Sequence, residues 1–189
     1  MARRALIIGG PRNSKKLVDI LSKEGYDVES TADCVRAVDL ARMFTPDVVL
    51  MDVNLPCDDP LSVAPRIIAE RPVPIVMHSS HSEIDQVLRA DEMGVSAHLF
   101  RPITRENLLG AIELGMSRFR QCQLLRAEVT DCKEALRIRK LVERAKGILM
   151  KRNSLTEEEA FLKLQRLSRD SNMKMEKVAE SIITANEIM

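Results

Sequence analysis

The sequence predicts an α/β domain with a doubly wound, parallel, five-stranded sheet, then a long connecting helix and an all-α module of three helices. Two observations predict this order. Short, continuously apolar runs alternate with helical stretches over the first hundred residues, which is typical of parallel strands covered on both faces. No proline follows Pro102, and apolar residues then recur at helical spacing to the end of the chain.

Four of the five predicted strands are short apolar runs, at 5–8, 47–51, 74–77 and 97–100. Residues 26–30 are expected to form the remaining strand, the second along the chain. Helical spacing lies between them, over 13–24, 33–43, 61–70 and 82–93. In sheets of this kind, functional groups collect at the carboxyl ends of the strands.

The helix after Thr104 is expected to run on past the α/β domain. Five side chains then recur at 3-4-3-4 spacing, which is typical of a coiled-coil seam and predicts a homodimer: Cys122, Leu125, Val129, Cys132 and Leu136. Because the seam is short, a helix that packs back on its own domain is the alternative.

The tail is expected to form three helices, over about 134–152, 157–170 and 174–187. Thr156 and Glu159 predict a capping box at the start of the second. We therefore divide the chain into residues 1–118, 119–136 and 137–189.

Composition narrows the class of protein. The sequence contains no run of about 18 apolar residues, so no membrane span is expected. The apolar stretch before Gly9 is too short for a secretory signal, so a cytoplasmic protein is expected. The four cysteines form no C-x-x-C pair, and we expect free, buried thiols rather than a metal or redox site.

The formal net charge of +1 hides an asymmetry. Residues 1–103 hold 12 Lys and Arg against 15 Asp and Glu, whereas residues 104–189 hold 17 against 13. Within 137–152 seven residues are basic and one is acidic. This cluster indicates a polyanionic partner, with a solvated helix face as the alternative.

Polar residues follow three of the apolar runs. Asp52 and Ser79 come at the ends of the third and fourth predicted strands, and Arg101 follows the fifth. Over about residues 3–118 this arrangement resembles the receiver domain of response regulators. The resemblance implies that exposed Asp52 accepts a phosphoryl group, that Ser79 hydrogen-bonds a phosphate oxygen, and that the cation at 101 neutralises charge.

The chain departs from the receiver pattern at three positions. Gly9-Gly10 stands where the family has the acidic pair that holds Mg²⁺, Arg101 stands at a lysine position, and His98 replaces the aromatic switch. Mg²⁺ depends on carboxylate ligands. We therefore expect a degenerate receiver without Mg²⁺ or another cofactor, with phosphorylation of Asp52 as the alternative. Asp58-Asp59 offers carboxylates, but from a different loop.

The tail carries a second set of motifs. They are Ala145-Lys146-Gly147, Leu149-Met150, Glu159-Ala160, Leu164, Lys174 and Val178-Ala179. These resemble the ANTAR family of RNA-binding antitermination modules over the last quarter to third of the chain. The resemblance implies a dimeric domain that binds hairpins in leader transcripts and prevents intrinsic termination.

The positions of individual residues on the predicted helices of the tail indicate which are structural and which contact RNA. Ala145, Leu149, Ala160, Leu164 and Val178 are expected to be structural. Phe161, the single aromatic residue of the tail, is expected in the core with Leu164 and Leu167. Gly147 lies beside the basic face and indicates close approach of a ligand or, alternatively, of another helix. RNA contacts are expected from Arg144, Lys146, Lys151, Arg152, Arg169, Lys174 and Lys177.

These features predict a non-enzymatic regulator that binds RNA hairpins and is controlled by a sensor kinase or a sequestering sensor protein. His78 and Ser79 lack a G-x-S-x-G elbow, so no catalytic site is expected. A DNA-binding response regulator and a protein-only signalling adaptor are the alternatives. Pro74-Ile-Val-Met77 and Gly94-Val-Ser-Ala97 resemble the nitrate-assimilation regulators within the family.

Overall fold

The computed structural model describes residues 2–55, 62–79, 89–90 and 92–187. The chain divides into two compact units, residues 1–123 and 124–189. Helix α5 (Arg105–Asn153) runs through this division and is 49 residues long. The expected fifth helix, the connector and the first helix of the tail are therefore one continuous helix.

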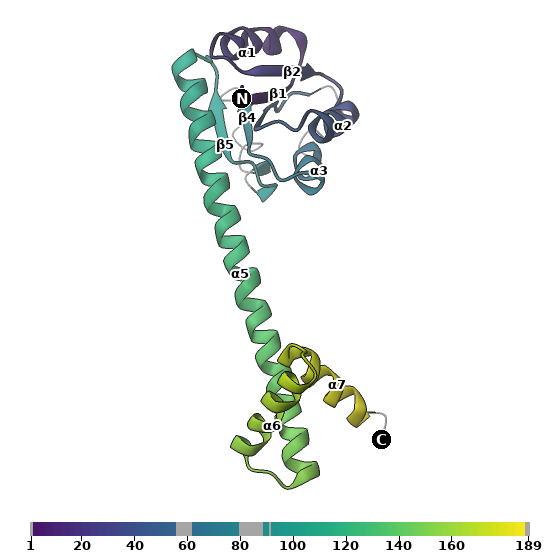
Figure 1. Cartoon of the computed structure of the whole chain (residues 1–189). Coiled ribbons are helices and arrows are strands. Elements are labelled where there is room, and N and C mark those ends of the chain that lie inside the picture. The colour runs from purple at the N-terminus through teal and green to yellow at the C-terminus, as the bar shows by residue number, and fades with distance from the viewer. Residues whose placement is uncertain (1, 56–61, 80–88, 91, 188–189) are drawn as a thin grey trace. The chain divides into compact units, whose positions relative to one another are not determined.

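The first unit is built on a parallel sheet (Figure 1). Its strands are β1 (Arg4–Ile8), β2 (Asp27–Thr31), β3 (Val48–Asp52), β4 (Ile75–Ser79) and β5 (Ala97–Phe100), in the order β2-β1-β3-β4-β5. Helices α1 (Pro11–Lys23), α2 (Cys34–Phe44) and α3 (Val63–Glu70) connect the first four strands. The predicted sheet is confirmed. The helix expected over 82–93 lies largely outside the described residues.

Both faces of the sheet are buried. Ile7 of β1 packs with Leu17 of α1 and Ile112 of α5, whereas the next residue, Ile8, packs with Ile67 of α3. Successive side chains of a strand point to opposite faces. The continuous apolarity of the strands follows from burial on both sides.

The second unit packs the end of α5 against α6 (Glu157–Asp170) and α7 (Met175–Glu187). The capping box is confirmed: Thr156 N donates to Glu159 at 2.8 Å, and Glu159 N donates to the Thr156 hydroxyl at 3.3 Å. All five motif residues expected to be structural are buried in one apolar cluster: Ala145, Leu149, Ala160, Leu164 and Val178.

The prediction that Phe161 and Leu167 lie in the core is wrong. Their side chains are 38% and 39% exposed, while Leu164 is fully buried. Helix α6 buries the narrow stripe of Ala160 and Leu164, which are four residues apart and share a face. A small unit made of the end of α5 and two short helices has too few neighbouring elements to cover the flanks of that stripe.

The cysteines also differ from expectation. Cys122 and Cys132 are free but exposed on α5, and Cys34 is disulfide-bonded, so the expectation of free, buried thiols is wrong for these three. Other seam residues are exposed as well: Leu125, Val129 and Leu136. No helix in the described ranges is long and apolar enough to cross a bilayer.

Candidate functional site

The carboxyl edge of the sheet brings together the three polar residues singled out in the sequence. Asp52 ends β3, Ser79 ends β4 and Arg101 follows β5, and these strands are neighbours. The Arg101 Nη2 atom donates to Asp52 Oδ2 at 2.8 Å, and Arg101 N donates to the Ser79 carbonyl oxygen at 3.1 Å. Asp52 was expected to be exposed at this edge, but it is 1% exposed, because Arg101 and neighbouring segments cover it.

The buried carboxylate of Asp52 is bonded from several sides. Its Oδ2 atom also accepts from Asn13 Nδ2 at 2.7 Å, and its Oδ1 atom accepts from Asn54 N at 3.0 Å. His78 Nδ1 lies 3.9 Å from Oδ2. Sequence reasoning missed Asn13, although its place in the first turn of α1, next to the carboxyl end of β1, was a usable signal.

The described donor set does not fit Mg²⁺. Gly9 and Gly10 supply no carboxylate after β1, and Oδ2 of Asp52 already accepts from a guanidinium. Mg²⁺ requires near-octahedral oxygen ligands. Space is not the obstacle at Gly10, where an added Cβ would meet no atom within 4 Å. No three His, Cys, Asp or Glu side chains of the described residues are placed to hold a metal; Asp58-Asp59 lies outside this part of the chain.

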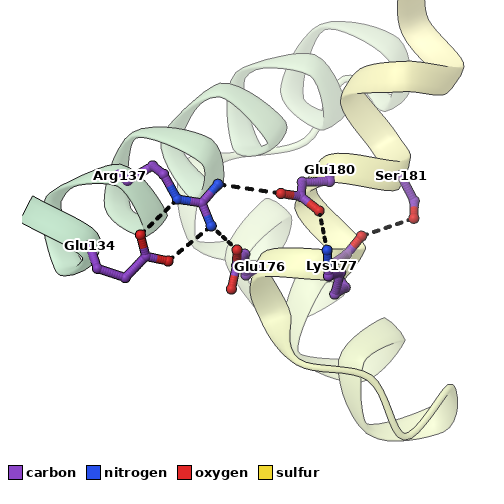
Figure 2. A network of polar contacts seen from close by, with 6 residues as sticks. All are labelled: Glu134, Arg137, Glu176, Lys177, Glu180 and Ser181. Carbon is purple, nitrogen blue, oxygen red and sulfur yellow. Dashed lines mark hydrogen bonds and ion pairs between the residues drawn. The ribbon is translucent and has the colours of Figure 1, made fainter. Parts of the chain in front are cut away.

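Several basic residues of the second unit form ion pairs with carboxylates of the same unit. The Nη1 and Nη2 atoms of Arg137 on α5 contact Glu180 and Glu176 on α7, and its Nε atom contacts Glu134 at 2.9 Å (Figure 2). Hydrogen bonds from Glu134 and Glu180 raise the pKa of Arg137. Lys177 lies 3.0 Å from the same Glu180. Arg137 therefore ties α5 to α7 by charge as well as by packing.

Two expected RNA contacts also have carboxylate partners. Arg144 Nη2 lies 2.8 Å from Glu187 Oε1 at an exposed site. Lys146 was expected on an exposed flank, but it is 8% exposed, and its Nζ atom lies 2.7 Å from Glu157 and 2.9 Å from Glu143. Hydrogen bonds to Glu157 and then Glu143 raise the pKa of Lys146. The start of α6 covers this flank of α5. A helical wheel of α5 alone does not show this contact.

The remaining expected contacts are exposed. Lys151, Arg169 and Lys174 form no ion pair with any other residue in the described ranges, and Arg152 is exposed beside Lys151. They lie at the end of α5 and around the turn between α6 and α7. Gly147 also faces open space, since an added Cβ would meet no atom within 4 Å, so close helix packing does not explain it.

Two family models match the chain. The response regulator receiver domain matches residues 10–113, and the ANTAR domain matches residues 130–183. The chain belongs to the response regulators that carry a receiver domain followed by an ANTAR domain. It is 41% identical over 168 residues to the transcriptional regulatory protein PdtaR of Mycobacterium tuberculosis, covering 88% of this chain and 82% of PdtaR.

Two of the solved structures similar to the chain are receiver domains. The signal receiver domain of a modulated diguanylate cyclase from Desulfovibrio desulfuricans G20 is 25% identical to this chain, with a TM-score of 0.58. The match covers 64% of this chain and 98% of the diguanylate cyclase domain. The receiver domain of the sensor histidine kinase PA1611 from Pseudomonas aeruginosa PAO1 has a magnesium ion in its active-site cleft. It is 25% identical to this chain with a TM-score of 0.56, and the match covers 62% of this chain and 99% of that domain. The predicted receiver-like fold is confirmed. The likeness to nitrate-assimilation regulators stays a prediction.

Proposed function

We infer that this protein is a cytoplasmic transcription antitermination regulator that binds RNA hairpins in leader transcripts through its ANTAR domain. The inference is supported by the ANTAR match and by the regulatory name of its 41% identical relative. The observation that carries it is exposed positive charge without a carboxylate partner among the described residues, at Lys151, Arg169 and Lys174. Such side chains can neutralise phosphates at no cost in lost ion pairs.

The candidate contacts fall into two groups. Lys151, Arg169 and Lys174 are the primary phosphate contacts in this proposal, and Arg152, which is exposed beside Lys151, is a further candidate. Arg144 and Lys177 are secondary, because each must exchange a carboxylate for a phosphate. The cost of the exchange is about 0–1 kcal/mol, the usual contribution of an exposed ion pair, so these two residues rank only slightly below the others.

The receiver-like domain is proposed to signal without Mg²⁺ and without phosphorylation of Asp52. In the receiver family the cation neutralises transferred phosphate, whereas Arg101 here already neutralises the unmodified carboxylate. A sensor protein that binds and sequesters the regulator is the control that fits this arrangement; a sensor kinase acting on Asp52, with Ser79 as phosphate ligand, is the alternative.

The exposed seam of α5 is proposed to pair with a second copy of the chain. In a parallel pair Glu128, at heptad position g, lies opposite Lys133 at position e of the other helix. An antiparallel pair would instead bring the basic e positions, Arg126 and Lys133, toward each other. Sedimentation equilibrium tests this proposal, and a monomer at tens of micromolar protein would contradict it.

A gel shift separates this function from its rivals. We expect the full chain to bind hairpin RNA at low salt and to bind duplex DNA of the same sequence much more weakly. Preference for the duplex would favour a DNA-binding response regulator. No binding to either nucleic acid would favour a protein-only adaptor.

A further inference from the structure

Two free thiols lie on the exposed seam of α5. Cys122 and Cys132 are both exposed, and three apolar residues complete the seam at 3-4-3-4 spacing: Leu125, Val129 and Leu136. These three side chains are each at least half exposed, and none of the five residues belongs to an apolar cluster of the described ranges. Helix α5 is continuous along the whole seam. A surface that covers the seam therefore also meets both thiols.

The surface that fits the seam is the same seam of a second copy. Leu125 occupies heptad position d and Val129 position a, and valine at a with leucine at d favours two parallel strands. The pairing of Glu128 with Lys133 of the other copy favours the same direction.

In a parallel pair each thiol faces the same thiol of the other helix. Cys122 lies at position a and Cys132 at position d, and both positions form layers with their own counterparts. Helix axes packed about 8–10 Å apart bring facing Cα atoms to within roughly 4–6 Å of each other. A disulfide needs Cα atoms about 4.4–6.8 Å apart. The packing distance of two helices therefore suits a disulfide at both layers.

We propose that Cys122 and Cys132 are oxidation sites, each of which forms a disulfide with the same residue of a second copy. Hydrogen peroxide is the oxidant. One thiol attacks the peroxide, the O–O bond breaks, and a sulfenic acid and a water form. The facing thiol then attacks the sulfenic sulfur, the S–S bond forms, and the sulfenic oxygen leaves as a second water. Two thiols thus lose two electrons and two protons to one peroxide.

These disulfides change how the dimer responds to dilution. A non-covalent dimer dissociates as the protein concentration falls, whereas two copies joined through their seams stay together. Disulfides of cytosolic proteins are usually transient and redox-sensing. The seam is then a reversible switch between a dissociating dimer and a permanent one. This inference rests on the proposed dimer, because it requires the two seams to meet.

The test treats the full wild-type chain with stoichiometric hydrogen peroxide and maps the disulfides by mass spectrometry. Trypsin cleaves after Arg126, between the two thiols, so each thiol lies on its own peptide. We expect most of the chain to become a covalent dimer that dithiothreitol reverses, with Cys122 joined to Cys122 and Cys132 to Cys132. This mapping uses the wild-type chain and does not depend on whether a variant folds.

Single variants test the direction of the pair. The 3-4-3 spacing from Cys122 to Cys132 is symmetric, so an antiparallel pair would instead place Cys122 against Cys132 of the other copy. In the parallel dimer Cys122→Ser keeps the disulfide at Cys132, and Cys132→Ser keeps the disulfide at Cys122. The double variant should lose the covalent dimer.

A thiol placed off the seam is the matched control. Ala127 is exposed on the same helix at heptad position f, which points away from a partner. Ala127→Cys, added to the double variant, should restore less than about a tenth of the wild-type covalent dimer, because thiols that point apart are not bridged.

Sedimentation equilibrium of the reduced chain keeps this inference apart from the proposed dimer. A reduced chain that stays monomeric contradicts the dimer itself. If the reduced chain is a dimer, three results overturn the oxidation sites alone: no covalent dimer with peroxide, disulfides that join Cys122 to Cys132, or equal crosslinking through Ala127→Cys.

Discussion

At the scale of single residues, the neighbours of a charge decide what it can do. Arg137 and Lys174 are both basic and both belong to the second unit. Arg137 contacts three carboxylates, whereas Lys174 forms no ion pair with the other described residues. The former stabilises the contact between α5 and α7, and the latter remains available to a polyanion.

The difference between these residues is measurable in RNA titrations over a range of KCl. Lys174→Ala and Arg169→Ala should each weaken binding and make the salt slope shallower by roughly 0.7–0.9. Arg137→Ala is the matched control, and it should lower the melting temperature more than it changes the slope. Equal slopes for all three variants and the wild type would mean that the RNA surface lies elsewhere.

A substitution at Gly147 should affect the stability of α5 and the affinity for RNA in opposite directions. Since its surroundings are open, Gly147→Ala should stabilise α5 by up to about 1 kcal/mol. If RNA approaches the backbone here, the same methyl group should weaken RNA affinity. Thermal unfolding and a hairpin titration of the same preparation measure the two effects, and tighter or unchanged binding would argue against close approach at this residue.

Asp52 should resist phosphorylation by acetyl phosphate with Mg²⁺. The physical reason is the missing acidic pair at Gly9 and Gly10 together with the Arg101 ion pair at 2.8 Å. Intact mass after incubation reports the added group, with Asp52→Asn as the control. Near-stoichiometric labelling that Asp52→Asn abolishes would instead establish phosphorylation-dependent control.

At the scale of elements, the start of α6 is held by ionised carboxylates. The pKa of Glu157 is lowered by Lys146, and that of Glu159 is lowered by hydrogen bonds from Thr156. The Lys146–Glu157 contact joins the end of α5 to α6, and the Thr156–Glu159 contact caps the start of α6. Docking of α6 therefore depends on charge as well as on the apolar stripe of Ala160 and Leu164.

The pH dependence of α6 follows from these directions. A carboxylate whose pKa is lower in the folded state stabilises the fold above its unfolded value, about 4.3 for Glu. That contribution is lost as the pH falls through the lowered folded values. The second unit should therefore lose stability below about pH 4.5, and Glu159→Gln should make the loss shallower. Thermal melts by circular dichroism across this range check the expectation; a loss that begins above pH 6 would contradict it.

At the scale of the whole molecule, the two units have separate apolar cores. Residues buried around the sheet belong to two clusters in the first unit, and a third cluster belongs entirely to the second. No residue is shared between the first two clusters and the third. Each unit therefore has the interior that independent folding requires.

Truncation tests this independence. A fragment of residues 1–123 should unfold cooperatively on heating, because it retains both clusters on the sheet. It should also lose all RNA binding, since the tail is absent. A fragment without a cooperative transition in circular dichroism would show that the sheet domain needs the tail to fold.

The sequence alone determined the sheet, the approximate positions of most helices and the capping box of this protein. Local signals carry such features: continuous apolarity for β3, helical spacing for α7, and Thr156 with Glu159 for the entry to α6. Gly9-Gly10 likewise showed directly that the acidic pair is absent.

Only the tertiary structure decided which side chains are available. It buried Asp52 under Arg101 and Asn13, buried Lys146 between two carboxylates, and left Phe161 exposed. Most of these partners, namely Glu157 for Lys146 and Asn13 and Arg101 for Asp52, are 11 to 49 residues away in the chain. A helical wheel or a strand pattern describes one element at a time, whereas burial and charge pairing depend on the element that packs against it.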